Sequence, residues 1–149
     1  MAVRNKAAGF YANHHHGGND WLNNTAYLNG TNFNMLCRNE TGDVPGFGHR
    51  MKNNLGYKGR TEVSNLDAAA GDVSGNYFNL PVKAEDKDFA GLDVAELIKP
   101  RQANGDLPEM AFLHLVRDSS LTDQGTDVGL PFAGKAPDLG AFEFGGVKK

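Results

Sequence analysis

Short apolar runs separated by glycine, asparagine and aspartate recur along the first part of the chain. Runs bounded in this way by turn-forming residues are typical of strands. The predicted strands are Gly9–Asn13, Trp21–Tyr27, Asn32–Leu36, His49–Tyr57 and, as a further candidate, Thr61–Leu66. The abundance of glycine and asparagine favours tight turns between them over long helices.

The apolar runs belong to a repeat. The segment Asn23–Gly30 (NNTAYLNG) returns as Asn53–Gly59 (NNLGYKG), and Ala2–Phe10 is a partial earlier copy. Phe10 and Phe33 lie 23 residues apart, which gives a period in the low twenties. Such a period, with short apolar runs and recurring asparagine, predicts the coils of a parallel β-helix.

The repeat also predicts which side chains stack. Inward and outward residues alternate along a strand, so equivalent residues of successive coils should stack inside the solenoid. The expected stacks are Phe10 with Phe33, Tyr27 with Tyr57, and Leu22 with Met51 or the neighbours of Lys52. Asn24 and Asn54 should form an internal ladder at a corner, where their amides satisfy backbone groups of the turns.

The polar segment Cys37–Gly48 interrupts the repeat and lengthens the coil between Asn24 and Asn54 to 30 residues. Insertions at one corner of a solenoid often wall a binding groove. From about Asp67 the repeat fades, and Asn76–Leu80 is the last candidate strand.

The C-terminal half predicts a cap. A short helix is expected over Val94–Lys99, because Asp93 is a favourable N-cap and Pro100 ends it. The apolar stretch Leu107–Leu115 should pack on the coils, and Ala136–Glu143 should form a terminal clasp. The sequence therefore predicts an all-β fold, with β-helix coils over residues 1–80 and an irregular C-terminal cap over residues 81–149.

Composition excludes several classes of protein. A chain of 149 residues is expected to form one domain. The net charge of −3 argues against a basic nucleic-acid surface, and the basic tail Lys148–Lys149 is expected to be a solvated end. No segment has the roughly 20 apolar residues needed to span a bilayer. The N-terminus lacks the apolar core of a signal peptide.

Cysteine and histidine offer candidate chemistry. Cys37 is the one cysteine, so no internal disulfide is possible. It is either a buried apolar side chain or a nucleophile assisted by a histidine of His14–His16, about one coil earlier. His14 and His16 could share one face of an extended chain and bind zinc with Asp20, or they could lie in a plain exposed turn.

Carboxylates gather in the second half of the chain. They comprise Glu85, Asp86 and Asp88, followed by Asp118 and Asp123. A calcium loop is one interpretation, although the spacing lacks the EF-hand pattern. The alternative is that these carboxylates cap turns.

Several motifs occur in a specific order. They are Asn5–His14 (NKAAGFYANH), Asn23–Tyr27 (NNTAY), Asn32-Phe33, Asn53-Asn54, Asp88-Phe89, Leu107–Glu109 (LPE) and Pro137–Glu143 (PDLGAFE). Together they resemble the C-terminal part of family 9 polysaccharide lyases, which are pectate lyase-like proteins. The resemblance covers nearly the whole chain. It implies that the coils form a right-handed parallel β-helix.

The resemblance implies calcium-assisted β-elimination of polygalacturonate, in which Ca²⁺ neutralises developing charge and a lysine removes a proton. In that family the base lysine stands in a Gly-Phe-Lys motif. Here Gly9-Phe10 is followed by Tyr11, Asn32-Phe33 is followed by Asn34, and no Asp-Asp-Gly cluster occurs. We therefore expect a truncated piece of a lyase that lacks the base and the calcium ligands and is inactive by itself.

Glycan contacts remain as candidate functions. Tyr11 and Asn34 should lie in register on successive coils, at the position of the family's lysine. Arg38 could pair with a uronate carboxylate. The predicted substrate-binding residues are Lys6, Tyr11, Asn13, His14, His16, Asn34 and Arg38. No catalytic residue and no metal ligand is predicted.

The expected partner is an acidic polysaccharide, with neither nucleic acid nor membrane. The resemblance implies a secreted or periplasmic protein. An open N-terminal coil that exposes Phe10 should also favour self-association. A non-catalytic carbohydrate-binding or structural β-helix module is the alternative function, and a piece of a reading frame without an independent role is a third.

Overall fold

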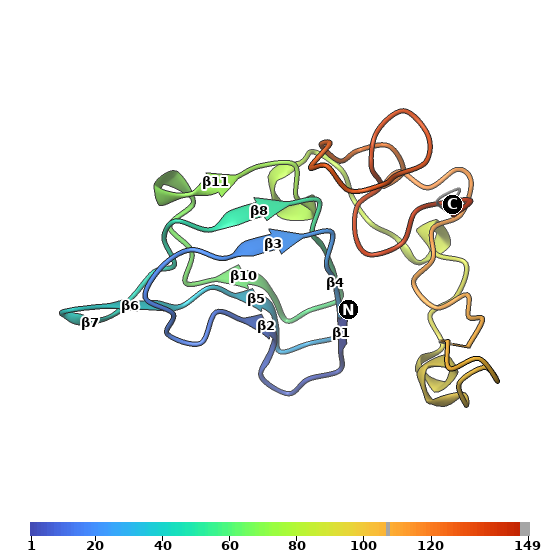
Figure 1. Cartoon of the computed structure of the whole chain (residues 1–149), viewed down its shortest axis with the longest axis horizontal. Coiled ribbons are helices and arrows are strands. Elements are labelled where there is room, and N and C mark those ends of the chain that lie inside the picture. Colours follow the sequence, from blue (N-terminus) through green and yellow to red (C-terminus); the bar gives the residue numbers. More distant parts are fainter. Residues whose placement is uncertain (107, 147–149) are drawn as a thin grey trace.

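The computed structural model describes residues 1–106 and 108–146 and is built from short strands and 3-10 helices (Figure 1). Leu107 and the basic tail Lys148–Lys149 lie outside the described residues. The strands are β1 (Ala2–Val3), β2 (Ala8–Tyr11), β3 (Asp20–Leu22), β4 (Thr25–Tyr27), β5 (Thr31–Asn34), β6 (Cys37–Asn39), β7 (Gly42–Val44), β8 (Arg50–Lys52), β9 (Leu55–Tyr57), β10 (Thr61–Ser64) and β11 (Asp72–Val73). The 3-10 helices are η1 (Ala68–Ala70), η2 (Tyr77–Asn79), η3 (Asp86–Asp88) and η4 (Val94–Ile98).

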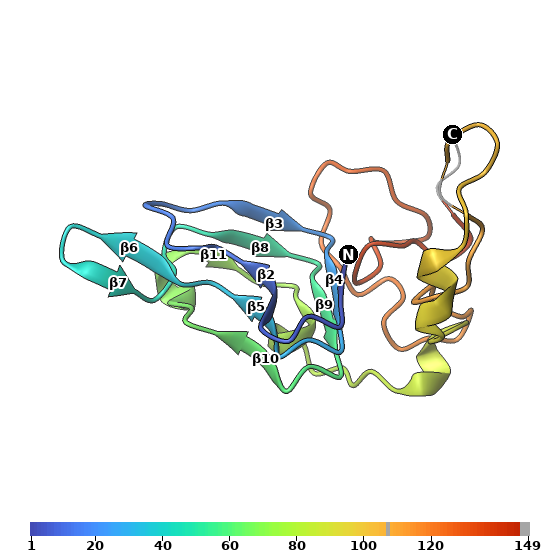
Figure 2. The same ribbon diagram turned by 90° about the horizontal axis from the view of Figure 1, so that it is seen from below.

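Successive coils add one strand each to three parallel sheets within the described residues. The strand orders are β1-β4-β9, β2-β5-β10 and β3-β8-β11. Every neighbouring pair in these sheets is parallel. Figures 1 and 2 show the coils stacked side by side, with the hairpin β6–β7 projecting from the end opposite the C-terminal segments. The predicted parallel pairing between coils is confirmed.

The coils turn where asparagine adopts a left-handed backbone conformation. Asn23 has a φ of 50° and Asn53 a φ of 57°. Asparagine tolerates this region better than other residues with a Cβ. The predicted strands Trp21–Tyr27 and His49–Tyr57 are therefore wrong as single elements, because each is broken at this asparagine into two strands on different sheets.

The predicted asparagine ladder is confirmed and is longer than expected. Asn24 Nδ2 donates to Asn54 Oδ1 at 3.0 Å, and Asn54 Nδ2 donates to Asn76 Oδ1 at 2.7 Å. The predicted strand Asn76–Leu80 is wrong. The chain forms the 3-10 helix η2 there, and the buried Asn76 binds Asn79 Oδ1 at 2.8 Å instead of starting a strand.

Apolar side chains fill the inside of the coils. Phe10 stacks on Phe33 with ring centroids 5.3 Å apart, as predicted. The predicted stack of Leu22 with Met51 is wrong. Trp21 pairs in register with Met51, whereas Leu22 pairs with Lys52. Side chains alternate along a strand, so Leu22 lies on the other side of the sheet from Trp21.

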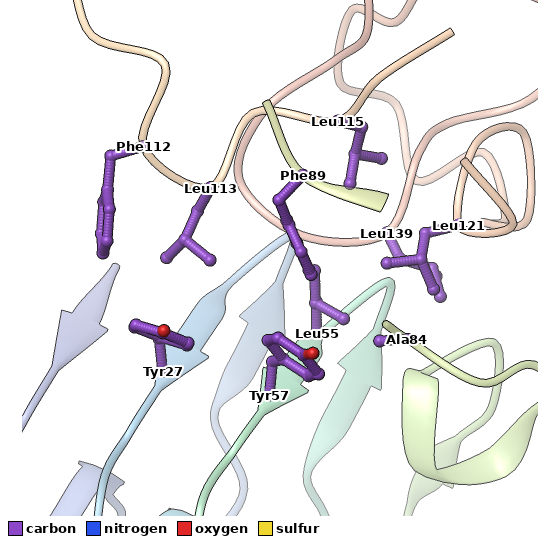
Figure 3. Packing of buried hydrophobic residues seen from close by; sticks show 10 residues of the cluster. All are labelled: Tyr27, Leu55, Tyr57, Ala84, Phe89, Phe112, Leu113, Leu115, Leu121 and Leu139. Carbon is purple, nitrogen blue, oxygen red and sulfur yellow. The ribbon is translucent and has the colours of Figure 1, made fainter. Parts of the chain in front are cut away.

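Tyr27 and Tyr57 stack as predicted, with centroids 5.9 Å apart, but not inside the coils. They belong to a cluster that the C-terminal segments cover (Figure 3). Phe112 meets Tyr27 edge to face at 5.7 Å. Ala26, between Thr25 and Tyr27, packs with Phe33 inside the coils, so alternation sends Tyr27 to the opposite side of the strand.

The C-terminal segments pack on the coils through backbone and side-chain contacts. The predicted packing of Leu107–Leu115 is confirmed for Phe112, Leu113 and Leu115, which are buried in the same cluster. In the predicted clasp, Gly140 N donates to Asn53 O at 2.8 Å and Ala141 N to Thr25 Oγ1 at 2.8 Å. The domain boundary at residue 80 stays a prediction.

The predicted short helix exists as the 3-10 helix η4. Asp93 caps it, because the Asp93 carboxylate accepts a hydrogen bond from Ala95 N at 2.9 Å. Among residues 1–106 and 108–146, no helix combines the length and the apolar character that a bilayer crossing requires.

Candidate functional site

An open hollow of about 640 Å³ lies over the sheet β2-β5-β10. Its lining includes Lys6, Tyr11 and Asn34, which are three of the predicted substrate-binding residues. Tyr11 and Asn34 pair in register on neighbouring strands, as predicted. The side chain of Arg60, which sequence reasoning missed, also lines the hollow.

A hydrogen-bonded network lies beside this hollow. The hydroxyl of Tyr11 is 2.8 Å from His14 Nε2, and His14 Nδ1 is 2.8 Å from Asp43 Oδ1. Arg38 donates to the same Asp43 oxygen from Nε at 2.9 Å. The network therefore brings together Tyr11, His14 and Arg38, all predicted, around Asp43, which was not.

The hydrogen bonds of the network determine which ring nitrogen of neutral His14 carries the proton. The Asp43 carboxylate is an acceptor, so His14 donates from Nδ1 and neutral His14 keeps an acceptor at Nε2 for the Tyr11 hydroxyl. The hydrogen bond from Arg38 is the main cause that holds the pKa of the Asp43 carboxyl below its usual value, and the bond from His14 adds to it. Tyr11, at the edge of the hollow, is thus connected to Arg38 through His14 and Asp43.

We expect the Arg38→Gln substitution to raise the pKa of Asp43 towards its ordinary value, because the largest stabilising contact of the carboxylate is lost. The measurement is an NMR titration of the Asp43 carboxyl carbon. His14→Gln is the matched control and should raise this pKa less. An unchanged Asp43 titration in Arg38→Gln would contradict the assignment.

Asp43 reaches the site through the antiparallel hairpin β6–β7. Arg38 and Asp43 are partners in its register, and Gly42 turns the chain with a φ of 126°. Glycine readily adopts this conformation. The segment Arg38–Asp43 (RNETGD) has the composition of a hairpin turn, and this signal could have predicted the pair.

Two predicted residues lie apart from the hollow. Asn13 and His16 are exposed, and neither belongs to the lining of the hollow. In the described part of the chain, no three His, Cys, Asp or Glu side chains gather as a metal site. The zinc alternative with Asp20 therefore has no geometric support, and Asp43 binds His14 instead.

The carboxylates considered for calcium bind other groups of the chain. Asp88 accepts hydrogen bonds from Glu85 N at 2.7 Å and Ser120 N at 2.9 Å. Asp123 accepts one from Lys135 N at 2.8 Å. Asp86 binds the Tyr57 hydroxyl and the Lys58 ammonium group. These residues do not fit a calcium site, because their carboxylate oxygens are already bound to backbone N–H groups, a hydroxyl or an ammonium group.

Cys37 is buried beside a histidine that the sequence did not indicate. Its Sγ lies 3.4 Å from His49 Nε2. His49 Nδ1 accepts from Asn19 N at 3.1 Å and Trp21 Nε1 at 3.3 Å, so neutral His49 carries its proton on Nε2. Burial lowers the pKa of His49. The prediction that Cys37 is buried is confirmed, since the side chain is fully covered.

Comparison with known proteins gives close similarities to lyases, although no family model matches the chain. A protein named pectate lyase L from Dickeya chrysanthemi is 35% identical over 144 residues, which are 96% of this chain and 32% of that protein. Pectate lyase L from Dickeya dadantii (strain 3937) is 33% identical over 144 residues, with the same shares. The chain spans about a third of the length of these relatives.

Solved structures of lyases have a similar fold. Pectate lyase Pel9A is 31% identical with a TM-score of 0.80, over 95% of this chain and 34% of that protein. A rhamnogalacturonan lyase is 38% identical with a TM-score of 0.73, over 78% of this chain and 29% of that protein. Over nearly its whole length the chain thus resembles about a third of a pectate lyase, and the resemblance predicted from its motifs is confirmed.

Proposed function

We propose that this chain is the C-terminal, glycan-contacting part of a pectate lyase-like protein with a right-handed parallel β-helix. The observation that carries the proposal is the 35% identity with pectate lyase L over 96% of the chain. The hollow lined by Lys6, Tyr11 and Asn34 supports it, because a cation, an aromatic ring and an amide are groups that bind acidic sugars. Calcium-assisted β-elimination of polygalacturonate belongs, in this proposal, to a longer parent protein that is secreted or periplasmic.

We expect the 149-residue chain to bind polygalacturonate without cleaving it, because Asp88 and Asp123 hold backbone turns and Asp86 binds Tyr57 and Lys58. The measurement combines an affinity titration with an ultraviolet assay for unsaturated uronide, with and without added calcium. Unsaturated product that requires calcium would overturn the expected inactivity. Binding without turnover is also what the alternative, a non-catalytic carbohydrate-binding module, predicts.

A substitution of Tyr11 tests whether the glycan binds in the hollow. Tyr11→Ala should weaken binding about fivefold, the loss expected for one exposed aromatic contact, whereas Tyr11→Phe should keep most of the affinity. Equal affinity of Tyr11→Ala and the wild type would show that the hollow is not the glycan-binding site.

Self-association through the N-terminal coil stays a prediction, to be checked by light scattering at high concentration.

A further inference from the structure

Four basic side chains lie around a second hollow next to the first. The second hollow is lined by Arg4, Lys6, Lys58 and Arg60 among others, and it shares Lys6, Gly30 and Arg60 with the first. The residues lie where the chain turns from the sheet β1-β4-β9 to the sheet β2-β5-β10. We call Arg4, Lys6, Lys58 and Arg60 the basic corner.

The repeat itself stacks these residues. Gly30 N donates to Asn5 O at 2.9 Å, and Arg60 N donates to Asn29 O at 3.1 Å, so the three turns lie directly over one another. Arg4 and Lys58 occupy the same left-handed corner position, with φ values of 57° and 52°. With coils about 4.8 Å apart, these two positions are separated by roughly 10 Å along the coil axis.

Glycine at position 30 lets Arg60 reach across the middle coil. A Cβ on Gly30 would lie 2.9 Å from Arg60 Nη2 and 2.3 Å from Lys6 O. Because the glycine leaves this space, Arg60 Nη2 donates to Lys6 O at 3.1 Å. The guanidinium group is therefore held at the corner, with further donors left for a ligand.

The positive charge of the corner is largely uncompensated. Arg4, Lys6 and Arg60 take part in none of the ion pairs within residues 1–106 and 108–146. Lys58 pairs with Asp86 at 2.6 Å, and both side chains are substantially exposed. Three unpaired cations side by side in a chain of net charge −3 cost electrostatic repulsion, and an anionic ligand would relieve it.

We infer that the basic corner is a second subsite, which binds uronate carboxylates of a polysaccharide that continues from the first hollow. This inference rests on the proposed function, because the occupant of the first hollow supplies the neighbouring sugar. Arg60 suits a carboxylate, since its fork of N–H groups can make paired hydrogen bonds. Leu28, 39% exposed on the middle coil, offers an apolar contact between the cations.

The test compares variants of the full 149-residue chain in titrations with oligogalacturonate at low and moderate salt. Arg4→Gln, which changes a residue that lines the second hollow but not the first, and Arg60→Gln should each weaken binding about fivefold and make it less sensitive to salt, as expected for exposed charge contacts. Arg50→Gln is the matched control. It removes one exposed arginine from β8, on a different sheet, and should bind like the wild type.

The outcomes separate this inference from the proposed function. If the wild type does not bind oligogalacturonate, the proposed function fails and the inference fails with it. If the wild type binds and both Arg4→Gln and Arg60→Gln bind equally well, the inference alone is overturned. Tighter binding of single-stranded DNA than of oligogalacturonate would also overturn it. Thermal melts of each variant confirm that lost binding is not lost folding.

Discussion

Replacing Asn54 with leucine should destabilise the chain by about 3–5 kcal/mol, although the two side chains have the same branched arrangement of heavy atoms. Asn54 is fully buried, and its side chain makes four hydrogen bonds. Its Oδ1 accepts from the backbone and side-chain nitrogens of Asn24, and its Nδ2 donates to Trp21 O and Asn76 Oδ1. Leucine would remove this partner from the Asn24 donors and from Trp21 O, whereas Asn76 Oδ1 keeps its bond from the backbone N–H of residue 54. Each group left unsatisfied where water cannot reach it costs about 1–3 kcal/mol.

Urea unfolding followed by circular dichroism measures this loss. Asn54→Asp is an informative second variant, because it keeps the acceptor for Asn24 and loses the donor for Asn76. Asn104→Ala, at an exposed position, is the control and should change stability by less than about 0.5 kcal/mol. If Asn54→Leu costs no more than this control, the ladder does not hold the coils together.

The Glu62→Gln substitution should stabilise the chain at neutral pH by about 1–2 kcal/mol. Glu62 lies next to Gly56, and its Oε2 accepts from Asn32 Nδ2 at 2.9 Å. Its Oε1 is buried and has no hydrogen-bond partner. Burial raises the pKa of the Glu62 carboxyl, with the bond from Asn32 acting in the opposite direction. Glutamine keeps the acceptor for Asn32 and removes the charge.

The sign of the pH dependence follows from the raised pKa. Between the unfolded pKa and the raised folded pKa, the folded state binds more protons than the unfolded state, so stability falls as pH rises. The charge of Glu62 therefore costs no stability below the unfolded pKa of 4.5, and its full cost is present above the folded pKa. The advantage of Glu62→Gln should grow from acid to neutral pH and then level off.

Chemical unfolding at a series of pH values measures this advantage. Glu40→Gln is the matched control, because Glu40 is an exposed carboxylate between β6 and β7. Glu40→Gln should change the free energy of unfolding by less than about 0.5 kcal/mol at neutral pH, as expected for an exposed position. An advantage of Glu62→Gln that is the same at acid and neutral pH would show that the buried carboxylate is not the cause.

Local patterns predicted much of the coil and part of the candidate site. The repeat correctly paired Phe10 with Phe33 and Tyr11 with Asn34, because parallel strands in register bring equivalent residues together. It did not tell which side of a strand faces inward. Tyr27 and Tyr57 pack under the C-terminal segments, whose apolar residues have no repeat to align them with the coils.

The sequence by itself determined the coil period, the asparagine corners and the stacked positions, because each of these recurs through one backbone register. Only the tertiary structure decided the contacts between residues that are not at equivalent positions of the coils. Asn76 joins the ladder from the N-cap of the 3-10 helix η2, Asp43 reaches His14 through the hairpin, and Arg60 crosses Gly30 to Lys6. These contacts depend on the path of irregular segments and on the space that neighbouring side chains leave. A local sequence pattern predicts neither of these.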